Sequence, residues 1–301
     1  MKRYILLTFL FLCHLVVLGQ VSLAYHLQKG DIYRVKQEAQ QIITQELDGA
    51  SHQITNLIDG VLEFKVLSEV PEGYKLSLTF KDLNLKMTSS IEGTLMNVQA
   101  KKVVPGDIQS KIFNTILENP VTLLLSKTGD ILNVKGGDSL VSKMAKVSGL
   151  TDEFAINLMK KSLSKEFGSE ALANSYKQMT FIYPNKTVQL KDSWENTYTG
   201  KLKTHNKWTL NEINGQKALI SGMATIEMNI KDPNTTMRLK GTQKTSIQSN
   251  IDTGFIFTMT VEGRSSGVST LAQLGAQELP TTIQSKITYK LINKEHVQQK
   301  L

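Results

Sequence analysis

The chain is short of cysteine, and this limits how its fold can be held together. Its single cysteine, Cys13, lies in an apolar run near the N-terminus, and the rest of the chain has none. Disulfide bonds and zinc sites with several thiolate ligands are therefore excluded beyond that run. A chain of 301 residues must rely on an ordinary hydrophobic core, and this length can build one or two.

Sequence patterns that carry catalytic chemistry are also missing. The chain has no Gly-x-Ser-x-Gly elbow, phosphate-binding loop, His-Glu-x-x-His pair or dinucleotide-binding glycine pattern. His26, His52, His205 and His296 stand far apart in the sequence. Because a metal site needs three or four convergent ligands, we expect no bound metal. We nominate no catalytic residue and no cofactor, and the pattern favours a non-enzymatic role.

Arginine is scarce, although the chain is basic. The formal net charge is +8, and lysine supplies most of the excess. Beyond the N-terminal run the arginines are Arg34, Arg238 and Arg264. Proteins that read nucleic acids favour arginine, because its planar guanidinium pairs with phosphates and guanines. Nucleic acid is therefore not an expected partner.

A long apolar run occurs only at the N-terminus. Two basic residues precede residues 4–19, which contain no acid, lysine or arginine. This is typical of a signal peptide, whereas a membrane-spanning helix needs roughly 20 residues. Residues 1–24 are predicted to be a signal peptide cleaved before Tyr25, and cleavage after Gly19 is the alternative. We expect an exported protein, in the periplasm, at the cell surface or secreted, with no transmembrane segment after cleavage.

The first β-rich half, residues 25–136, alternates apolar and polar residues as strands do. Apolar residues occupy even positions from Tyr74 to Phe80 and odd positions from Leu83 to Met87. Such a change of phase turns apolar side chains to the other face unless one extra residue is accommodated. We therefore predict a β-bulge near Lys81 and Asp82.

Residues 137–178 form a block with helical periodicity. Apolar residues recur at three- and four-residue intervals, and Gly149 and Gly168 divide the block. The stripe includes Phe154, Leu158, Met159 and Phe167. A stripe of this kind is typical of packing into a core, and a lid over an apolar cavity is the alternative interpretation. Periodicity does not distinguish the two.

The second β-rich half, residues 179–301, shows more regular alternation. Alternate residues from Ala218 to Ile230 are apolar or small, and the small residues Gly222 and Ala224 leave room for a facing helix or a ligand. Turn motifs in the two halves also resemble one another. Common ancestry of the halves and chance recurrence of turn motifs both fit this pattern.

One segment of the second half resembles a known family. Residues 181–194 lead from a proline through Val188 and a Lys-Asp turn to Trp194, and an Asp-Thr-Gly hairpin and an isoleucine-rich strand follow. This pattern is similar to an uncharacterised family of secreted Bacteroidota proteins, a domain-of-unknown-function family. The resemblance spans most of the chain and implies an exported, β-rich protein of unassigned role. It supplies no binding or catalytic residues.

These patterns predict an α+β fold. We expect a curved antiparallel β-sheet, half-barrel-like and with two degenerate β halves as one interpretation, with the helical block packed on its concave face. By analogy of layout alone, periplasmic carriers cup acyl chains in a half-open barrel beneath helices. We therefore expect non-enzymatic binding of an apolar or amphipathic, lipid-like ligand. The candidate ligand-binding residues are Phe154, Leu158, Met159, Phe167, Gly222 and Ala224. The alternative is a structural or adaptor protein that contacts envelope proteins and has no small-molecule ligand.

Overall fold

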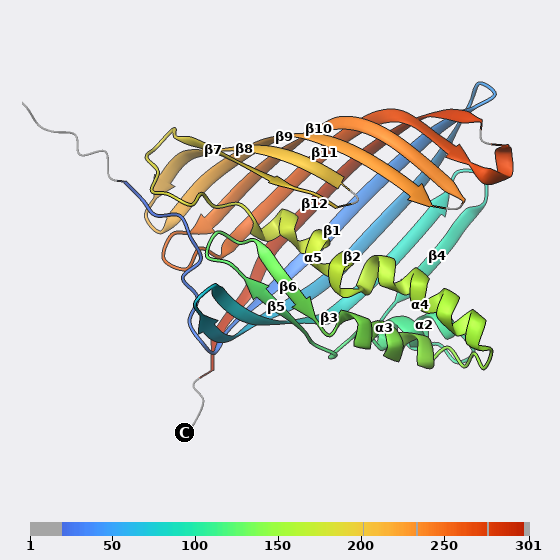
Figure 1. Cartoon of the computed structure of the whole chain (residues 1–301), viewed down its shortest axis with the longest axis horizontal. Helices are drawn as coiled ribbons and strands as arrows, with labels where there is room; N and C mark the ends of the chain where they lie inside the picture. Colours follow the sequence, from blue (N-terminus) through green and yellow to red (C-terminus); the bar gives the residue numbers. More distant parts are fainter. Residues whose placement is uncertain (1–19, 201, 233, 276, 298–301) are drawn as a thin grey trace, which may run out of the picture.

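In the computed structural model, one large curved sheet dominates the fold, and helices pack against it (Figure 1). The structure describes residues 20–200, 202–232, 234–275 and 277–297. Residues 1–19, which make up most of the predicted signal peptide, lie outside the described residues. The strands are β1 (Asp31–Leu47), β2 (Ala50–Val70), β3 (Gly73–Ser89), β4 (Gly93–Gln99), β5 (Val121–Leu125), β6 (Ile131–Lys135), β7 (Ser193–Tyr198), β8 (Leu202–Asn214), β9 (Lys217–Asp232), β10 (Thr235–Asn250), β11 (Ile256–Leu271) and β12 (Glu278–His296). The helices are α2 (Ile108–Asn114), α3 (Gly137–Lys146), α4 (Glu153–Phe167), α5 (Ser169–Thr180) and the short 3-10 helix η1 (Ala272–Leu274).

The twelve strands form one antiparallel sheet in which the two ends of the chain meet. The order is β6-β5-β3-β2-β1-β12-β11-β10-β9-β8-β7, and β4 joins the same edge of β3 as β5 does. The sheet is curved and open, because β6 and β7 end the path without closing it. The first and last strands pair along most of their length at its centre. The predicted curved antiparallel sheet is confirmed, and the two β-rich halves share it.

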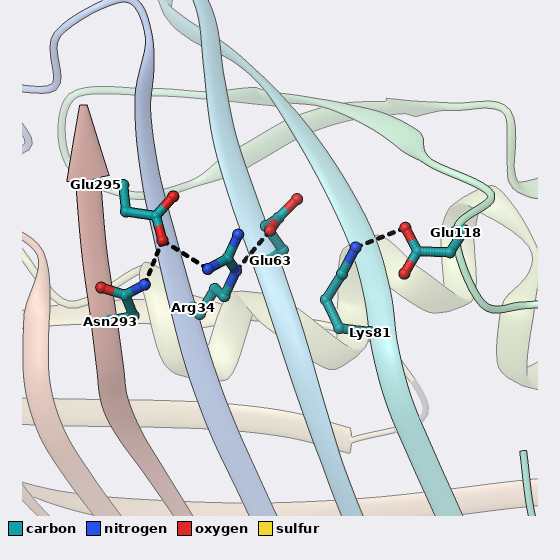
Figure 2. Close-up of polar contacts among 6 residues, drawn as sticks. All are labelled: Arg34, Glu63, Lys81, Glu118, Asn293 and Glu295. Atoms are coloured by element: carbon teal, nitrogen blue, oxygen red, sulfur yellow. Dashed lines mark hydrogen bonds and ion pairs between the residues drawn. The ribbon is translucent and has the colours of Figure 1, made fainter. Parts of the chain in front are cut away.

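The predicted β-bulge is confirmed at Lys81. Along β2, Val61 pairs with Asp82 and the next residue pairs with Phe80, so Lys81 is the extra residue of β3. The Lys81 ammonium lies 2.6 Å from the carboxylate of Glu118, which holds the segment after α2 against β3 (Figure 2). Because of the bulge, apolar residues on both sides of Lys81 face the same cavity.

An arginine joins the central strands on the polar side of the sheet. The Arg34 guanidinium donates to Glu63 of β2 and to Glu295 of β12, each at 2.7 Å, and Asn293 also donates to Glu295 (Figure 2). The Arg34 side chain is 32% exposed. Because solvent screens such pairs, each contributes at most about 1 kcal/mol to stability. Their main effect is to favour the register of β12, β1 and β2.

A cluster of buried aromatic side chains packs at one end of the strands. Tyr33 of β1 stacks on Phe255 with ring centroids 4.0 Å apart, and Phe255 also meets Phe64 of β2 at a steep angle. Tyr25 packs edge to face against Tyr183, and both side chains are 2% exposed. These rings come from separate parts of the chain, so this core joins the two β-rich halves.

The N-terminal segment that the structure describes is part of this core. Val21 and Val188 exchange two backbone hydrogen bonds of 2.8 and 2.9 Å. Leu23 is 3% exposed and belongs to the core. Cleavage before Tyr25 would remove these contacts, whereas cleavage after Gly19 would keep them.

The helical block is anchored through α3 and α5, and α3 buries Leu140, Val141 and Met144. Leu172, Tyr176 and Met179 of α5 are buried, whereas α4 has no buried residue. Gly168 separates the two helices, as its place in the sequence predicts. A Cβ atom on Gly168 would lie 2.6 Å from the Ser164 carbonyl oxygen, so the close approach at this break requires glycine. The last turn of α4 is therefore held close to the sheet, while its first turns are more exposed.

Candidate ligand-binding groove

Along strands β1, β2 and β3, the packed core is followed by two cavities. Val35 of β1, Leu62 of β2 and Leu78 of β3 are at most 1% exposed. Further along the same faces, the side chains become half-buried and line two cavities. The packed core is therefore confined to one end of these strands.

The smaller cavity, about 270 Å³, lies between the sheet and the helices. Its helical wall includes Phe167 of α4 and Leu172 and Tyr176 of α5. The ring of Phe167 meets the rings of Phe80 and Phe113 edge to face, with centroids 6.5 and 5.9 Å apart. Its sheet wall is formed mainly by Ile58, Gly60, Leu62, Phe80, Leu83 and Leu85. The walls are thus mostly aliphatic and aromatic.

The larger cavity, about 440 Å³, continues along the same face of the sheet. Ile58 pairs with Ala39 on one side and with Leu85 on the other, so these three side chains form a row across three strands. Its apolar lining also includes Met87, Met96 and Ile287. Both cavities share Ile58, Leu85, Met96 and Glu166. We therefore treat them as one site, the helix–sheet groove, defined by these four shared residues.

Polar side chains are interspersed in the larger part of the groove. Asn56 donates from Nδ2 to Gln41 Oε1 at 3.1 Å. The Asn56 Oδ1 atom is buried and has no hydrogen-bond partner within the described part of the chain. A buried acceptor without a partner costs roughly 1–3 kcal/mol, which a hydroxyl or amide donor of a ligand would recover. The groove therefore suits an amphipathic molecule better than a pure hydrocarbon.

The tyrosines beside the groove are kept neutral. Burial raises the pKa of Tyr176 well above its ordinary value, and the neighbouring Tyr289 phenol raises it further. Burial likewise raises the pKa of Tyr289. Both phenols stay protonated at physiological pH, so Tyr176 contributes uncharged ring surface to the groove wall.

The predicted helical site residues do not all reach the groove. Phe167 lines it, and Met159 is half-buried and packs against the core. Phe154 and Leu158 are 77% and 60% exposed and do not line either cavity. The structure therefore brings one of the four helical candidates into the groove.

The expected open space at Gly222 is filled. A Cβ atom on Gly222 would lie 2.4 Å from the ring of Trp208, its partner on β8, so the indole of Trp208 occupies the space next to this glycine. Trp208 is 2% exposed, and its indole N–H donates to Asn196 at 3.2 Å. Ala224 is also buried on β9, which lies four strands beyond β1 in the sheet. The glycine accommodates a tryptophan of the chain itself.

Sequence analysis missed the residues on the sheet side of the groove. The change of phase around Lys81 was the available signal, because the bulge places Leu83 and Leu85 on the same cavity as Phe80. That signal predicts the bulge, and by itself it does not predict a site. The half-buried Ala39 gave no such signal, because small residues in strands have many roles.

Two further observations concern metal ligands and helix length. Among the described residues, no group of three or more histidine, cysteine, aspartate or glutamate side chains is placed to hold a metal ion. Within the same ranges, no helix is both long enough and apolar enough to cross a bilayer.

Comparison with solved structures finds a shared fold at low sequence identity. The chain is similar to the structure titled "Lipid-protein interactions in lipovitellin", with 12% identity, a TM-score of 0.53, and 92% of this chain and 26% of that chain covered. The chain thus spans about a quarter of that lipovitellin chain, and the likeness shows the fold alone. An outer membrane channel from Pseudomonas putida F1 matches with 7% identity over 89% of this chain and 97% of that chain, and its TM-score of 0.27 supports no argument. Among curated proteins, none matches this sequence.

A family model matches a large part of the sequence. The model described as "Family of unknown function (DUF6263)" covers residues 71–256, which is more than half of the chain. The prediction of a domain-of-unknown-function family is confirmed, while its Bacteroidota origin and its secretion stay predictions. The chain belongs to the DUF6263 family, whose function is unknown.

Proposed function

We propose that this protein binds an apolar or amphipathic, lipid-like ligand in the helix–sheet groove, without enzymatic turnover. The observation that carries the proposal is the pair of adjoining cavities of about 270 and 440 Å³ with largely apolar walls. Small-molecule sites commonly have such volumes and such linings with a few polar groups. On this proposal the helical block covers the concave face of the sheet, and the ligand lies between the two.

The groove offers different environments to the two ends of an amphipathic ligand. An acyl chain would lie along the row formed by Ala39, Ile58 and Leu85, where burial gains about 25 cal/mol per Å² of apolar surface. A polar end would lie near Gln41 and Asn56, whose amides can donate and accept hydrogen bonds. Part of the lipovitellin chain shares this fold, and its structure is titled for lipid–protein interactions, which supports the choice of ligand class.

Helix α4 is suited to act as the movable wall. None of its side chains is buried, so displacing it exposes less apolar surface than displacing α5 would. Phe167 at its last turn contacts Phe80 and Phe113 and would remain the pivot. A ligand would enter by lifting the first turns of α4 while Gly168 keeps α5 in place.

The proposal includes export of the protein. The apolar run before residue 20 has the features of a signal peptide. The buried Leu23 and the backbone bridge of Val21 favour cleavage after Gly19, which would keep both in the mature chain. The groove would then meet its ligand in the periplasm or outside the cell.

A substitution that fills the groove with a larger side chain tests the proposed ligand site. We would measure binding of a fluorescent fatty acid to delipidated protein, comparing Ala39→Phe with the control Ala50→Phe at the exposed start of β2. Ala39→Phe should weaken binding at least about tenfold, because the ring occupies the space of the ligand. Ala50→Phe should bind as the natural protein does. Equal binding by both variants, with unchanged folding, would rule out the groove as the site.

The alternative is a structural or adaptor role in the cell envelope. The observation in its favour is the open sheet, whose end strands β6 and β7 each pair on one side only. Unpaired strand edges can accept a strand from a partner protein. Absence of any bound or bindable lipid, together with retention of envelope proteins on the immobilised chain, would favour this role.

A further inference from the structure

We propose that the start of helix α4 docks onto the surface of an anionic phospholipid bilayer. The docking surface, which we call the α4 tip, consists of Val147, Leu150, Phe154 and Leu158. It lies outside the helix–sheet groove, since none of these residues lines either cavity. The inference goes beyond ligand binding and does not depend on the groove being occupied.

The α4 tip exposes large apolar side chains that a folded protein ordinarily buries. Val147, Leu150, Phe154 and Leu158 are 42%, 40%, 77% and 60% exposed. Phe154 and Leu158 are four residues apart on α4 and therefore project from one side of the helix. Val147 and Leu150 lie in the connection between α3 and α4, a few residues before Phe154 in the sequence. Among the described residues, Phe154 is the one phenylalanine with an exposed side chain.

Lysines flank the α4 tip on both sides along the chain. Lys143 and Lys146 lie in the last turn of α3, and Lys160 and Lys161 follow Leu158 on α4. No ion pair joins any of these four ammonium groups to an acidic side chain in the described ranges. Anionic headgroups attract lysines that lie near a membrane surface, and each such lysine strengthens membrane binding about a few-fold.

The acidic residues of this region do not offset that attraction. Asp152 caps α4 by accepting from the Ala155 amide at 2.7 Å, and Glu153 lies in the first turn. Carboxylates there are compensated by the unpaired N–H groups of the helix start. Residues 143–161 contain four lysines and two acidic residues, so their net charge is positive. This charge matches an anionic bilayer rather than a zwitterionic one.

The geometry also favours a bilayer as the occupant. Helices that lie in the membrane interface place aromatic and aliphatic side chains among lysines, whose apolar stems reach past them to the headgroups. In Figure 1 the connection between α3 and α4 lies at the periphery, away from β7 and β8. Since α4 carries no buried residue, it can rest on a membrane without opening the core.

Vesicle co-sedimentation tests the proposal. The full protein would be mixed with vesicles of phosphatidylcholine alone or of equimolar phosphatidylcholine and phosphatidylglycerol. We expect binding to the anionic vesicles that weakens as salt is added, because salt screens exposed charges. The double variant Phe154→Ser, Leu158→Ser should reduce the affinity at least about tenfold. The variant Lys160→Gln, Lys161→Gln should reduce the affinity for anionic vesicles roughly several-fold and make that affinity less dependent on salt.

Matched controls keep the result interpretable. Leu190→Ser changes an apolar residue that is 43% exposed before β7, and Lys203→Gln, Lys207→Gln removes two exposed charges from β8. Both controls should bind as the natural protein does, and all variants should keep its thermal midpoint, because the changed side chains are exposed or, at Lys160, half-buried. Ala39→Phe should also bind vesicles normally, which separates this proposal from the ligand site.

Three outcomes would overturn the proposal. The first is equal sedimentation of the natural protein and the Phe154→Ser, Leu158→Ser variant. The second is no preference for anionic over zwitterionic vesicles. The third is concentration-dependent self-association that the serine variant abolishes, without vesicle binding, because that result would assign the α4 tip to a second copy of the chain.

Discussion

Phe167 meets Phe80 edge to face, with ring centroids 6.5 Å apart, and this contact fixes the last turn of α4 above the bulged strand β3. Phe113 of α2 packs on the other edge of the same ring, at 5.9 Å. Met159 and Leu163 of α4 are half-buried and pack against the core, whereas Phe154 and Leu158 are exposed. The last turn of α4 is thus held by two ring contacts, whereas its first turn is more exposed.

Helix α4 should open more readily when this anchor is removed. Phe167→Ala is expected to destabilise α4 locally by roughly 1–3 kcal/mol, from lost ring contacts and partial burial. Hydrogen exchange of the α4 amides would show this as faster exchange in α4 than in α5. The matched control is Phe154→Ala on the same helix, whose ring is 77% exposed and whose loss should change exchange little. Equal effects of the two substitutions would contradict the assignment of Phe167 as the anchor.

Gly222 should be required by Trp208. Gly222→Ala places a Cβ atom 2.4 Å from the tryptophan ring, so we expect a loss of roughly 1–3 kcal/mol in the free energy of unfolding. Chemical denaturation would measure it. In a Trp208→Leu background the same substitution should cost much less, because the obstructing ring is gone. Equal costs in the two backgrounds would show that Gly222 serves the backbone rather than the tryptophan.

The protein should lose stability in alkaline solution. Burial raises the pKa values of Tyr25, Tyr176, Tyr183 and Tyr289 above the ordinary value of 10.0. Their stabilising effect is fully present below that value and is lost as pH rises towards the folded-state pKa, because only the unfolded chain then releases the protons. The slope is roughly 1.4 kcal/mol per pH unit for each phenol that ionises on unfolding alone.

Denaturation at neutral and alkaline pH would measure this loss. The test variant is Tyr176→Phe, which removes one of these phenols. The Tyr176 hydroxyl makes no side-chain hydrogen bond in the described part of the structure, so the loss of this group should have little other effect. The variant should match the natural protein near neutral pH and show a shallower decline above pH 10. A decline of the same slope in both proteins would exclude Tyr176 as a contributor.

The bulge and the break between helices could be predicted from the sequence, whereas the groove could not. The change of phase around Lys81 and the glycine at position 168 are local signals, and each has a local structural consequence. The groove depends instead on β1 pairing with β12, which are separated by most of the chain. No local pattern shows that Ala39 will lie beside Ile58 and Ile287.

The same reason explains why the sequence did not identify Trp208 as the neighbour of Gly222. Its small size was a correct signal that something approaches closely, but the identity of that group depends on the register between β8 and β9. Likewise, the helical stripe correctly predicted α4 without showing that Phe154 and Leu158 would face solvent. Periodicity gives the face of a helix, and the packing of α4 against its neighbours α3 and α5 decides which part of that face is covered.

The mature chain should begin at Gln20. Leu23 is 3% exposed and Val21 bridges Val188, so cleavage before Tyr25 would remove a core side chain and two backbone hydrogen bonds. We expect N-terminal sequencing and the intact mass of the exported protein to give Gln20 as the first residue. A chain that begins at Tyr25 would show that the fold does not need this segment.

Native mass spectrometry tests the central claim most directly. The protein would be purified without detergent from the cells that make it, its intact mass recorded under native conditions, and any bound molecule extracted with solvent. We predict a discrete adduct of one ligand per chain, with the mass of a lipid or another amphipathic molecule, that Ala39→Phe strongly reduces and Ala50→Phe does not. A mass equal to that of the unliganded chain, unchanged after incubation with envelope lipids, would contradict lipid binding in the helix–sheet groove.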